Sequence, residues 1–259
     1  MDDLKKIVHD YWQKNPCGTE FARSKEDLKQ YFGEIEEHRY SVEPFIHSFA
    51  QFTRWRGKRV LEIGVGAGTD HIQFGRAGAI LTGVDITSAA IELNKKRFEL
   101  EGLDSHLQQA DAENLPFEAE TFDLVYSWGV IHHTPDTQKA ADEIYRICKK
   151  GGKICVMIYH RYSLLVFALY LYHGLLKVRP LKTFSDVLAN HLESKGTKAY
   201  TVKEAKKMFE RFKNLKITTV VTPYDKNAVR PRFLQRIFSP LLNNLPSGLG
   251  FFMVIQGDK

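Results

Sequence analysis

Short apolar runs alternate with amphipathic stretches through the middle of this chain. The apolar runs are Val60–Ile63, Ala79–Ile86, Phe122–Ser127 and Lys153–Ile158, and His106–Gln109 is a weaker candidate for the third strand in chain order. Runs of this length, bounded by turn-forming residues, predict buried strands, and the stretches between them have helical spacing. Strands that alternate with helices are typical of an α/β fold with a parallel sheet and right-handed crossovers.

Two of the intervening helices have predictable ends. Thr87 or Ser88 is expected to cap the helix that Gly102 closes. The segment Thr134–Asp136 is expected to begin the other, with threonine as the cap, proline at the first position and aspartate near the positive end.

The second of these helices has an apolar face made of Ala141, Ile144 and Cys148. Lys149–Gly151 is expected to end it, because basic residues and glycine are common at helix C-termini.

The first 57 residues contain no clear strand pattern and predict a helical cap beside the ligand site. Helical spacing runs from Lys25 to about Thr53, and most of the aromatic residues in it are expected to be core. Tyr11, Arg39 and Tyr40 are the cap residues expected to reach a ligand.

The alternation breaks after the fifth strand, between about Tyr159 and Tyr200. Leu164–Leu176 is apolar on nearly all sides but shorter than the roughly 20 residues that a membrane span needs. Three interpretations stay open: a lipophilic substrate pocket, a helix on a membrane surface, or a buried helix. Basic residues flank the stretch, which keeps the membrane interpretation in view; they are Arg161, Lys177, Arg179 and Lys182.

The last third of the chain carries a capping box and two apolar runs. Thr201–Glu204 is expected to begin a helix. Leu215–Thr222 and Gly250–Gln256 predict two closing strands, so that the sheet has seven strands. Arg230–Leu242 mixes arginines with apolar residues, and predicts either pocket wall or an amphipathic helix on a membrane.

These elements predict one domain with four parts. The parts are an N-terminal cap (1–57), a core (58–158), an insertion with its following helix on the substrate side (159–212), and the closing strands (213–259).

Composition and charge narrow this picture only slightly. The chain has 259 residues, of which 43% are hydrophobic and 26% charged, as is ordinary for a globular protein. The net charge of +6 fits an acidic partner or simply a lysine-rich surface, and no long basic run decides for the former. The three cysteines have no paired spacing, which predicts neither disulfides nor a metal site. The charged N-terminus lacks a signal-peptide pattern, so a cytoplasmic location is expected.

The first predicted strand runs directly into a glycine-rich turn, Glu62–Gly68. Glycines at 64, 66 and 68 let a ligand approach the backbone closely. A dinucleotide fingerprint requires G-x-G-x-x-G, but its last position here is Thr69. The pattern is instead an acidic residue followed by G-x-G-x-G.

From this turn to about Ile158 the sequence resembles the class I S-adenosylmethionine-dependent methyltransferases. Glu62–Gly68 resembles their first motif, and Asp85 matches the acidic residue at the end of the second strand. Asp111–Phe117 and Phe122–Asp136 resemble the third and fourth motifs. The fourth is most similar to the subgroup that contains ubiquinone and menaquinone biosynthesis methyltransferases.

The resemblance implies S-adenosylmethionine as cofactor, S-adenosylhomocysteine as product, and a Rossmann-like sheet with helices on both faces. In the family, the glycine loop meets the amino-acid end of the cofactor, Asp85 the ribose hydroxyls, Asp111 the adenine amino group, and Ala112 gives backbone contacts. The expected cofactor-binding residues are Glu62, Gly64, Gly66, Gly68, Asp85, Ile86, Asp111, Ala112 and Trp128, with Tyr11 and Arg39 from the cap.

Methyl transfer requires an aligned acceptor and the exclusion of water, and an oxygen or carbon acceptor also needs a base. His132 and His133 follow the fourth strand, and His160 and Tyr162 follow the fifth, so all four are candidates. For the two adjacent histidines, the alternative is a structural role at the start of a helix.

The aromatic insertion predicts a small or medium, partly apolar acceptor, and a lipid-linked or glycan precursor at a membrane face fits this class. Ser127–Val130 stands where enzymes that methylate the amino groups of bases carry an Asn/Asp-Pro-Pro-aromatic motif, which makes nucleic acid a less favoured substrate. A nucleic-acid or protein methyltransferase and a non-catalytic cofactor-binding protein remain the alternatives.

Overall fold

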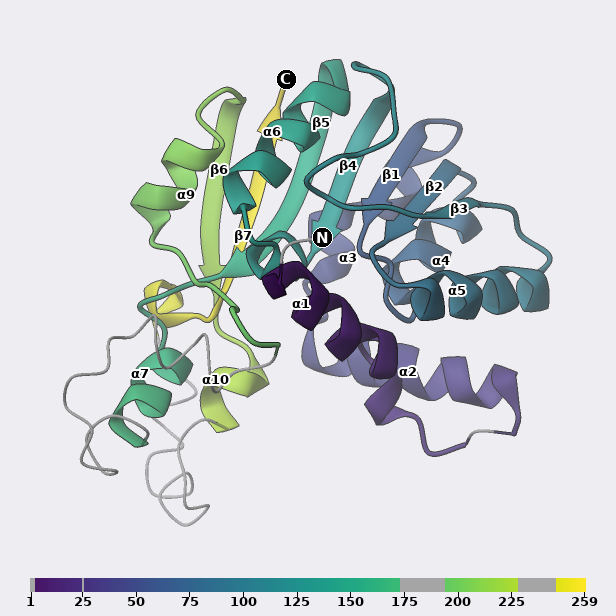
Figure 1. Ribbon diagram of the computed structural model, residues 1–259, viewed down its shortest axis with the longest axis horizontal. Helices are drawn as coiled ribbons and strands as arrows, with labels where there is room; N and C mark the ends of the chain where they lie inside the picture. Colours follow the sequence, from purple (N-terminus) through teal and green to yellow (C-terminus); the bar gives the residue numbers. More distant parts are fainter. Residues whose placement is uncertain (1–2, 25, 173–193, 228–245) are drawn as a thin grey trace.

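A seven-stranded sheet forms the centre of the protein (Figure 1). The computed structural model describes residues 3–24, 26–172, 194–227 and 246–259. The strand order is β3-β2-β1-β4-β5-β7-β6, and the first five strands of the chain are parallel to one another. Only β7 runs antiparallel, between β5 and β6. The strands are β1 (Arg59–Ile63), β2 (Ile80–Asp85), β3 (His106–Gln109), β4 (Phe122–Trp128), β5 (Cys148–Tyr159), β6 (Lys213–Val220) and β7 (Phe252–Asp258).

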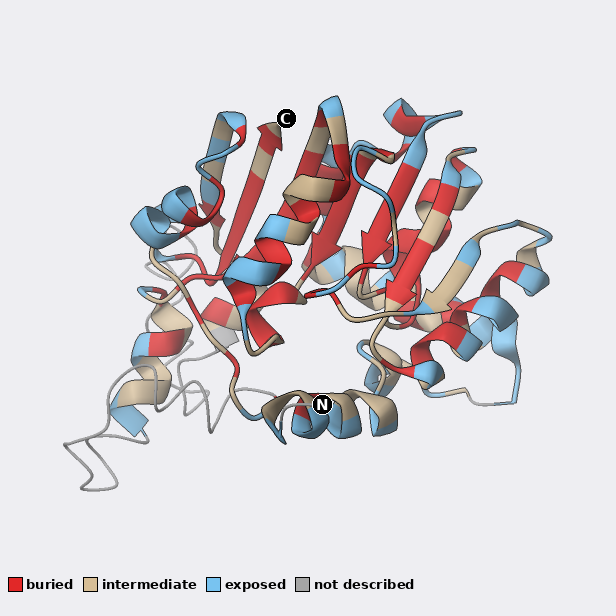
Figure 2. Cartoon of the chain, turned by 45° about the horizontal axis from the view of Figure 1, so that its top comes forward, coloured by how far each residue is buried: buried red, intermediate tan, exposed pale blue. Residues whose placement is uncertain are grey.

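Helices cover both faces of this sheet, as predicted. One apolar core includes α3 and α4 with the Val60 side of β1, and the other includes α6 and α9 with its Leu61 side. Successive strand residues point to opposite faces, so each central strand is buried on both sides (Figure 2). The described α-helices are α1 (Asp3–Lys14), α2 (Leu28–Val42), α3 (Ile46–Ala50), α4 (Thr69–Arg76), α5 (Ser88–Glu101), α6 (Thr137–Ile147), α7 (Leu164–Tyr170), α9 (Val202–Met208) and α10 (Pro223–Asn227).

Helix α1 lies within the predicted N-terminal helical cap, although the helical spacing recognised in the sequence begins only at Lys25. Only Val8 of this helix is buried. Its position is set by tertiary contacts, because it lies across the edge of the sheet where the parallel strands end (Figures 1 and 2).

Two predicted helix starts are confirmed. The Thr87 hydroxyl accepts a hydrogen bond from Ala90 N and caps α5, which ends at Gly102 in a left-handed conformation. Thr201 and Glu204 form the reciprocal capping box of α9.

The predicted start of α6 is wrong by two residues. The Thr134 hydroxyl donates to the Ile131 carbonyl and completes the preceding 3-10 turn, Ile131–His133. Asp136 is the cap, because its backbone is extended and its carboxylate accepts from Lys139 N at 3.0 Å.

The predicted end of α6 is also wrong. The helix stops at Ile147, and Cys148 pairs with Phe122 of β4 as the first residue of β5. Cys148 therefore belongs to the strand and not to the helix, because it pairs with β4. As a result, β5 is longer than the strand that the apolar run Lys153–Ile158 predicted.

Some predicted elements lie partly or wholly outside the described residues. They are residues 173–176 of the stretch Leu164–Leu176, with Lys177, Arg179 and Lys182, and the amphipathic stretch Arg230–Leu242. No helix within the described ranges is both long and apolar enough to span a bilayer.

The capping role of Asp136 predicts a stability effect. Asp136→Ala should lower the free energy of unfolding by about 1 kcal/mol, because Lys139 N loses its acceptor. Urea denaturation measures the change, and Lys139→Ala, which keeps the backbone donor, is the matched control. An alanine variant as stable as the original protein would contradict this assignment of the cap.

Candidate functional site

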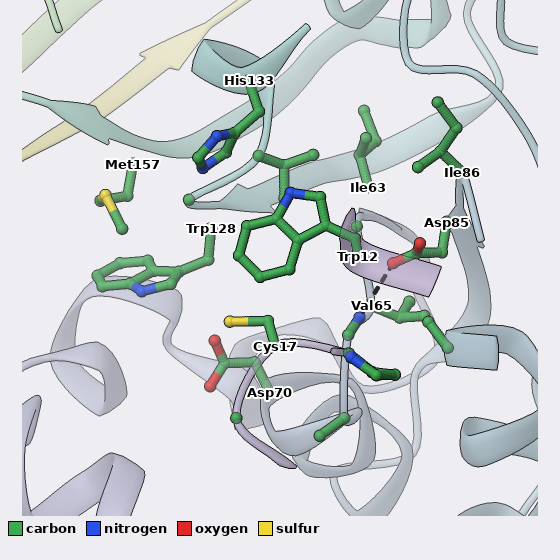
Figure 3. Close-up of a pocket in the computed structure, with 18 of the residues that line it drawn as sticks. Trp12, Cys17, Ile63, Val65, Asp70, Asp85, Ile86, Trp128, His133 and Met157 are labelled. Carbon is green, nitrogen blue, oxygen red and sulfur yellow. Dashed lines mark hydrogen bonds between the residues drawn. The ribbon is translucent and has the colours of Figure 1, made fainter. Parts of the chain in front are cut away.

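The carboxyl ends of β1, β2, β4 and β5 meet along one edge of the sheet, where a cavity of about 320 Å³ opens. Parallel strands of an open α/β sheet present their binding crevice at this edge. Helix α1 covers the cavity with Lys5, Val8 and Trp12 (Figure 3).

The glycine turn after β1 forms the floor of the cavity. Gly64 has a φ of +79°, and a side chain there would place its Cβ 2.2 Å from the Val130 side chain. A Cβ on Gly66, at a φ of +48°, would lie 3.3 Å from Cys17. Glycine is therefore required by conformation and by close approach from two sides.

Asp85 lies at the end of β2 and is held in one orientation beside this turn. One carboxylate oxygen accepts hydrogen bonds from the Thr87 backbone and hydroxyl at 2.9 and 2.8 Å. The other accepts from Gly66 N at 3.2 Å (Figure 3). Burial raises the pKa of Asp85, although these hydrogen bonds oppose the shift.

Asp111, after β3, joins the cavity to the N-terminal helix. Lys5 Nζ lies 2.6 Å from a carboxylate oxygen of Asp111 and 2.6 Å from one of Glu113. Burial alone lowers the pKa of Lys5, but the two carboxylates outweigh it and raise the pKa. The lysine therefore anchors α1 over the predicted adenine end.

Glu62 lies in the cavity wall and contacts His71 of α4. Its Oε2 is 3.1 Å from His71 Nδ1, and Ser105 Oγ is 2.8 Å from His71 Nε2. Burial lowers the pKa of His71 to about 3. Burial, and next the carboxylate of Asp70, raises the pKa of Glu62 well above its usual range.

A buried carboxylate that the sequence did not single out, Asp70, holds several groups of the wall. Its oxygens accept from Tyr126 Oη at 2.7 Å and Tyr40 Oη at 3.0 Å, and from Arg39 at 3.2 Å. An acidic residue in the first turn of a helix fits the helix dipole, so the sequence offered only that interpretation.

A second unpredicted carboxylate, Glu43, positions the indole of Trp128. It accepts from Trp128 Nε1 at 2.9 Å and lies 3.5 Å from Arg39 Nη1. The Arg39 guanidinium stands 5.6 Å from the centre of the Trp128 ring. The spacing of four residues between Arg39 and Glu43 is a local signal, but no local pattern marks the contact of Glu43 with Trp128, which comes from a distant segment.

The end of the cavity beyond Trp128 is aromatic. Tyr159 stacks on Phe251 with ring centres 4.2 Å apart, and Tyr224 lies 5.8 Å from Phe252. These rings come from the end of β5, from α10 and from the start of β7 and the residue before it. With their apolar neighbours they form what is called here the aromatic chamber, next to the glycine floor and its carboxylates. Its members are Trp128, Met157, Tyr159, Leu165, Tyr224, Phe251 and Phe252.

The structure brings most of the predicted site residues to this cavity. Those in its lining are Arg39, Glu62, Gly64, Gly66, Asp85, Ile86, Asp111, Ala112, Trp128 and His133. Gly68 lies just below, as the N-terminal cap of α4 at a φ of +74°. Tyr11 is 38% exposed and outside the lining, where its neighbour Trp12 takes the inward position.

The four predicted catalytic residues occupy different environments. His133 lines the cavity. His132 is fully buried against the ring of Tyr159, 3.9 Å away between centres, and burial lowers its pKa well below the usual range. His160 contacts the Gly250 carbonyl through Nδ1, and Tyr162 is 59% exposed; neither lines the cavity.

Comparison with known proteins gives matches centred on this region. Residues 61–156 match the model of a family described as a methyltransferase domain. An uncharacterized protein of Mycobacterium tuberculosis is 38% identical over 102 residues, which are 39% of this chain and 37% of that protein.

Two relatives carry functional names. A phthiotriol/phenolphthiotriol dimycocerosates methyltransferase of Mycobacterium ulcerans is 38% identical over 108 residues, 41% of this chain and 39% of that protein. A phosphatidylethanolamine N-methyltransferase of Cereibacter sphaeroides is 34% identical over 104 residues, 39% of this chain and 51% of that protein. The matches thus span only about half or less of these relatives.

A solved structure extends the similarity over nearly the whole fold. A phosphoethanolamine N-methyltransferase of Haemonchus contortus, in complex with phosphomonomethylethanolamine and S-adenosylhomocysteine, aligns with a TM-score of 0.59. It covers 97% of this chain and 60% of that one at 17% identity, so it supports the Rossmann-like methyltransferase fold.

The central role of Asp70 predicts that its charge stabilises the cavity wall. Asp70→Asn should lower the free energy of unfolding by about 2 to 4 kcal/mol, because an amide presents donors to groups that already donate. Tyr40→Phe, which removes one of these donors, should cost only about 1 kcal/mol. Urea denaturation of both variants gives the comparison, and an asparagine variant less destabilised than Tyr40→Phe would contradict the prediction.

Proposed function

We propose that this protein is an S-adenosylmethionine-dependent methyltransferase whose acceptor is a small or medium, partly apolar molecule. The observation that carries the proposal is the meeting of the glycine turn, Asp85 and Asp111 on one cavity that continues into an aromatic chamber. The match of residues 61–156 to a methyltransferase domain supports the same assignment.

The residues of the floor fit an extended cofactor that carries positive charge. A Cβ at Gly64 would collide with Val130 and one at Gly66 would crowd Cys17, so the turn presents bare backbone at these positions. Asp85 and Asp111 line the same cavity, and an ionised carboxylate accepts hydrogen bonds from hydroxyl or amino groups. Asp70, Glu43 and Arg39 leave more acidic than basic groups beside Trp128, which suits a sulfonium.

The chain itself contributes alignment, shielding and proton transfer. When bound, S-adenosylmethionine supplies a methyl group that its sulfonium already activates. Helix α1 and the aromatic chamber exclude water, and the chamber walls orient the acceptor relative to the floor. His133 is the candidate catalytic residue that faces the cavity, and it would take the proton of an oxygen or carbon acceptor.

The acceptor is proposed to be lipid-like or lipid-linked. Relatives with functional names include a phosphatidylethanolamine N-methyltransferase and a phthiotriol/phenolphthiotriol dimycocerosates methyltransferase. Helix α7 places Leu165 in the aromatic chamber and leaves Phe167 51% exposed, and Tyr162, two residues before the helix, is 59% exposed. A lipid-borne acceptor would approach the chamber along this apolar surface.

Cofactor binding tests the proposal directly. The protein should bind S-adenosylhomocysteine, and Asp85→Ala should weaken binding by about tenfold to a hundredfold, because hydrogen bonds to a carboxylate are lost. Isothermal titration calorimetry gives the affinities, and Glu92→Gln, on the exposed side of α5, is the matched control. An unchanged affinity in Asp85→Ala, or tight dinucleotide binding without S-adenosylhomocysteine binding, would overturn the cofactor assignment.

The aromatic chamber generates a separate prediction for the acceptor. Transfer of labelled methyl groups from S-adenosylmethionine into a chloroform–methanol extract of the source cells should be seen with the original protein. Tyr224→Ser should lower it about tenfold, because a partly buried aromatic ring is lost from the chamber, while S-adenosylhomocysteine affinity stays the same.

Leu249→Ser, which changes a 38% exposed residue outside the cavity, is the control for Tyr224→Ser. Label that enters RNA or protein in place of the extract would refute a lipid-like acceptor. Cofactor binding with no transfer into any fraction would favour a non-catalytic protein.

A further inference from the structure

The last part of the aromatic insertion, residues 194–200, is hydrogen-bonded to the 3-10 turn Ile131–His133 after β4 and to the end of β5. Lys198 N donates to the His132 carbonyl at 3.1 Å, and Tyr200 N donates to the Tyr159 carbonyl at 2.9 Å. These backbone hydrogen bonds fix residues 194–200 beside His133. Residues far apart in sequence are therefore held against one another behind His133, which lines the cavity.

Two buried hydroxyl groups of this segment contact one nitrogen of His133. Ser194 Oγ lies 2.9 Å and Thr197 Oγ1 lies 3.0 Å from His133 Nδ1. Both residues are 1% exposed. The Thr197 hydroxyl donates its hydrogen to the Ser194 carbonyl at 2.6 Å.

This arrangement determines which nitrogen of His133 carries the proton. Because the single hydrogen of Thr197 goes to the Ser194 carbonyl, Oγ1 can only accept from the imidazole. A bare Nδ1 would bring two lone pairs together at 3.0 Å, whereas a protonated Nδ1 makes both hydroxyl contacts favourable. The tautomer of a neutral histidine is set by such a hydrogen bond.

We propose that Thr197, assisted by Ser194, is a positioning residue that holds His133 as its Nδ1–H tautomer and makes Nε2 the basic nitrogen. Resting on the methyltransferase function proposed above, the inference adds that Nε2 takes the proton of an oxygen acceptor. His133 lines the cavity among the residues drawn in Figure 3, with its ring 5.4 Å from that of Trp12.

The proton transfer balances without another reactant. As the acceptor oxygen forms its bond to the methyl carbon, the sulfur–methyl bond breaks and its electron pair stays on sulfur. The proton of the acceptor hydroxyl passes to Nε2, and the imidazolium keeps its Nδ1–H bond to Thr197. Solvent takes the proton when the products leave.

The neighbouring histidine, His132, has no such hydroxyl partners in the part of the chain that the structure describes. Neither ring nitrogen of His132 has a hydrogen-bond partner among the described residues, and the ring is fully buried outside the cavity lining. His132 therefore packs as an aromatic ring, whereas hydroxyl groups orient His133.

Nitrogen-15 NMR of histidine-labelled protein tests the tautomer without any substrate. A bare imidazole nitrogen resonates far downfield of a protonated one, and the loss of signals in His133→Gln assigns the His133 pair. The original protein should show a protonated Nδ1 and a bare Nε2. Ser194→Ala and Thr197→Ser should keep this pattern, because the hydroxyl at 197 remains an acceptor.

Thr197→Val should shift the pattern toward a protonated Nε2, because the Ser194 hydroxyl can then donate to Nδ1 as well as accept from it, and nothing else obliges Nδ1 to keep the proton. Thr218→Val, an exposed threonine of β6, is the matched control and should change nothing. A bare Nδ1 in the original protein, or no shift toward a protonated Nε2 in Thr197→Val, would overturn the inference. If the valine variant does not fold, the original protein and Thr197→Ser still decide it.

The initial rate of labelled methyl transfer into the chloroform–methanol extract tests the role of Nε2. Thr197→Val should lower it about tenfold or more, Thr197→Ser should restore it to within about twofold, and S-adenosylhomocysteine affinity should not change. A full rate with a reversed tautomer would refute proton transfer to Nε2. Absence of S-adenosylhomocysteine binding would instead refute the methyltransferase proposal and leave the tautomer result standing.

Discussion

The absence of side chains at Gly64, Gly66 and Gly68, in the turn after β1, is the constraint on which the rest of the site depends. One residue from each of three segments lies close to this turn: Cys17 near Gly66, Val130 near Gly64, and Asn94 near Gly68. A Cβ at any of these glycines would come within 3.3 Å of its neighbour. Three segments can therefore approach the turn only because it has no side chain at these glycines. They are the N-terminal cap, the segment after β4, and α5.

Buried charge is the second organising feature, and it is concentrated on the same edge of the sheet. Asp70 and Glu43 share Arg39, and each also accepts from an aromatic side chain. Burying a carboxylate costs free energy, which its hydrogen bonds offset only in part. Networks of buried charge of this kind are common at binding sites. The network also fixes the indole of Trp128 at the boundary between the charged floor and the aromatic chamber.

The cavity thus has two halves with different chemistry. Its floor is made by the parallel core, which contains the residues that match a methyltransferase domain, and presents backbone groups and carboxylates. Its aromatic chamber is built by α7, α10, the end of β5 and the start of β7, which lie outside or at the edge of the matched residues 61–156. Differences in acceptor among proteins with similar cores are expected to reside in this second half.

The sequence by itself determined the parallel core, the caps of α5 and α9 and the candidate residues on the strand ends, because these signals are local. Tertiary structure decided the rest. It decided that α1 lies over the cavity, held by Lys5, and that Asp136 is the cap of α6. It also decided that Cys148 belongs to β5. It also assembled the Asp70 network and brought Thr197 to His133 across more than sixty positions of the chain. Hydrogen bonds between distant segments leave no periodic trace in a sequence, since each partner is chosen by where the folded backbone carries it.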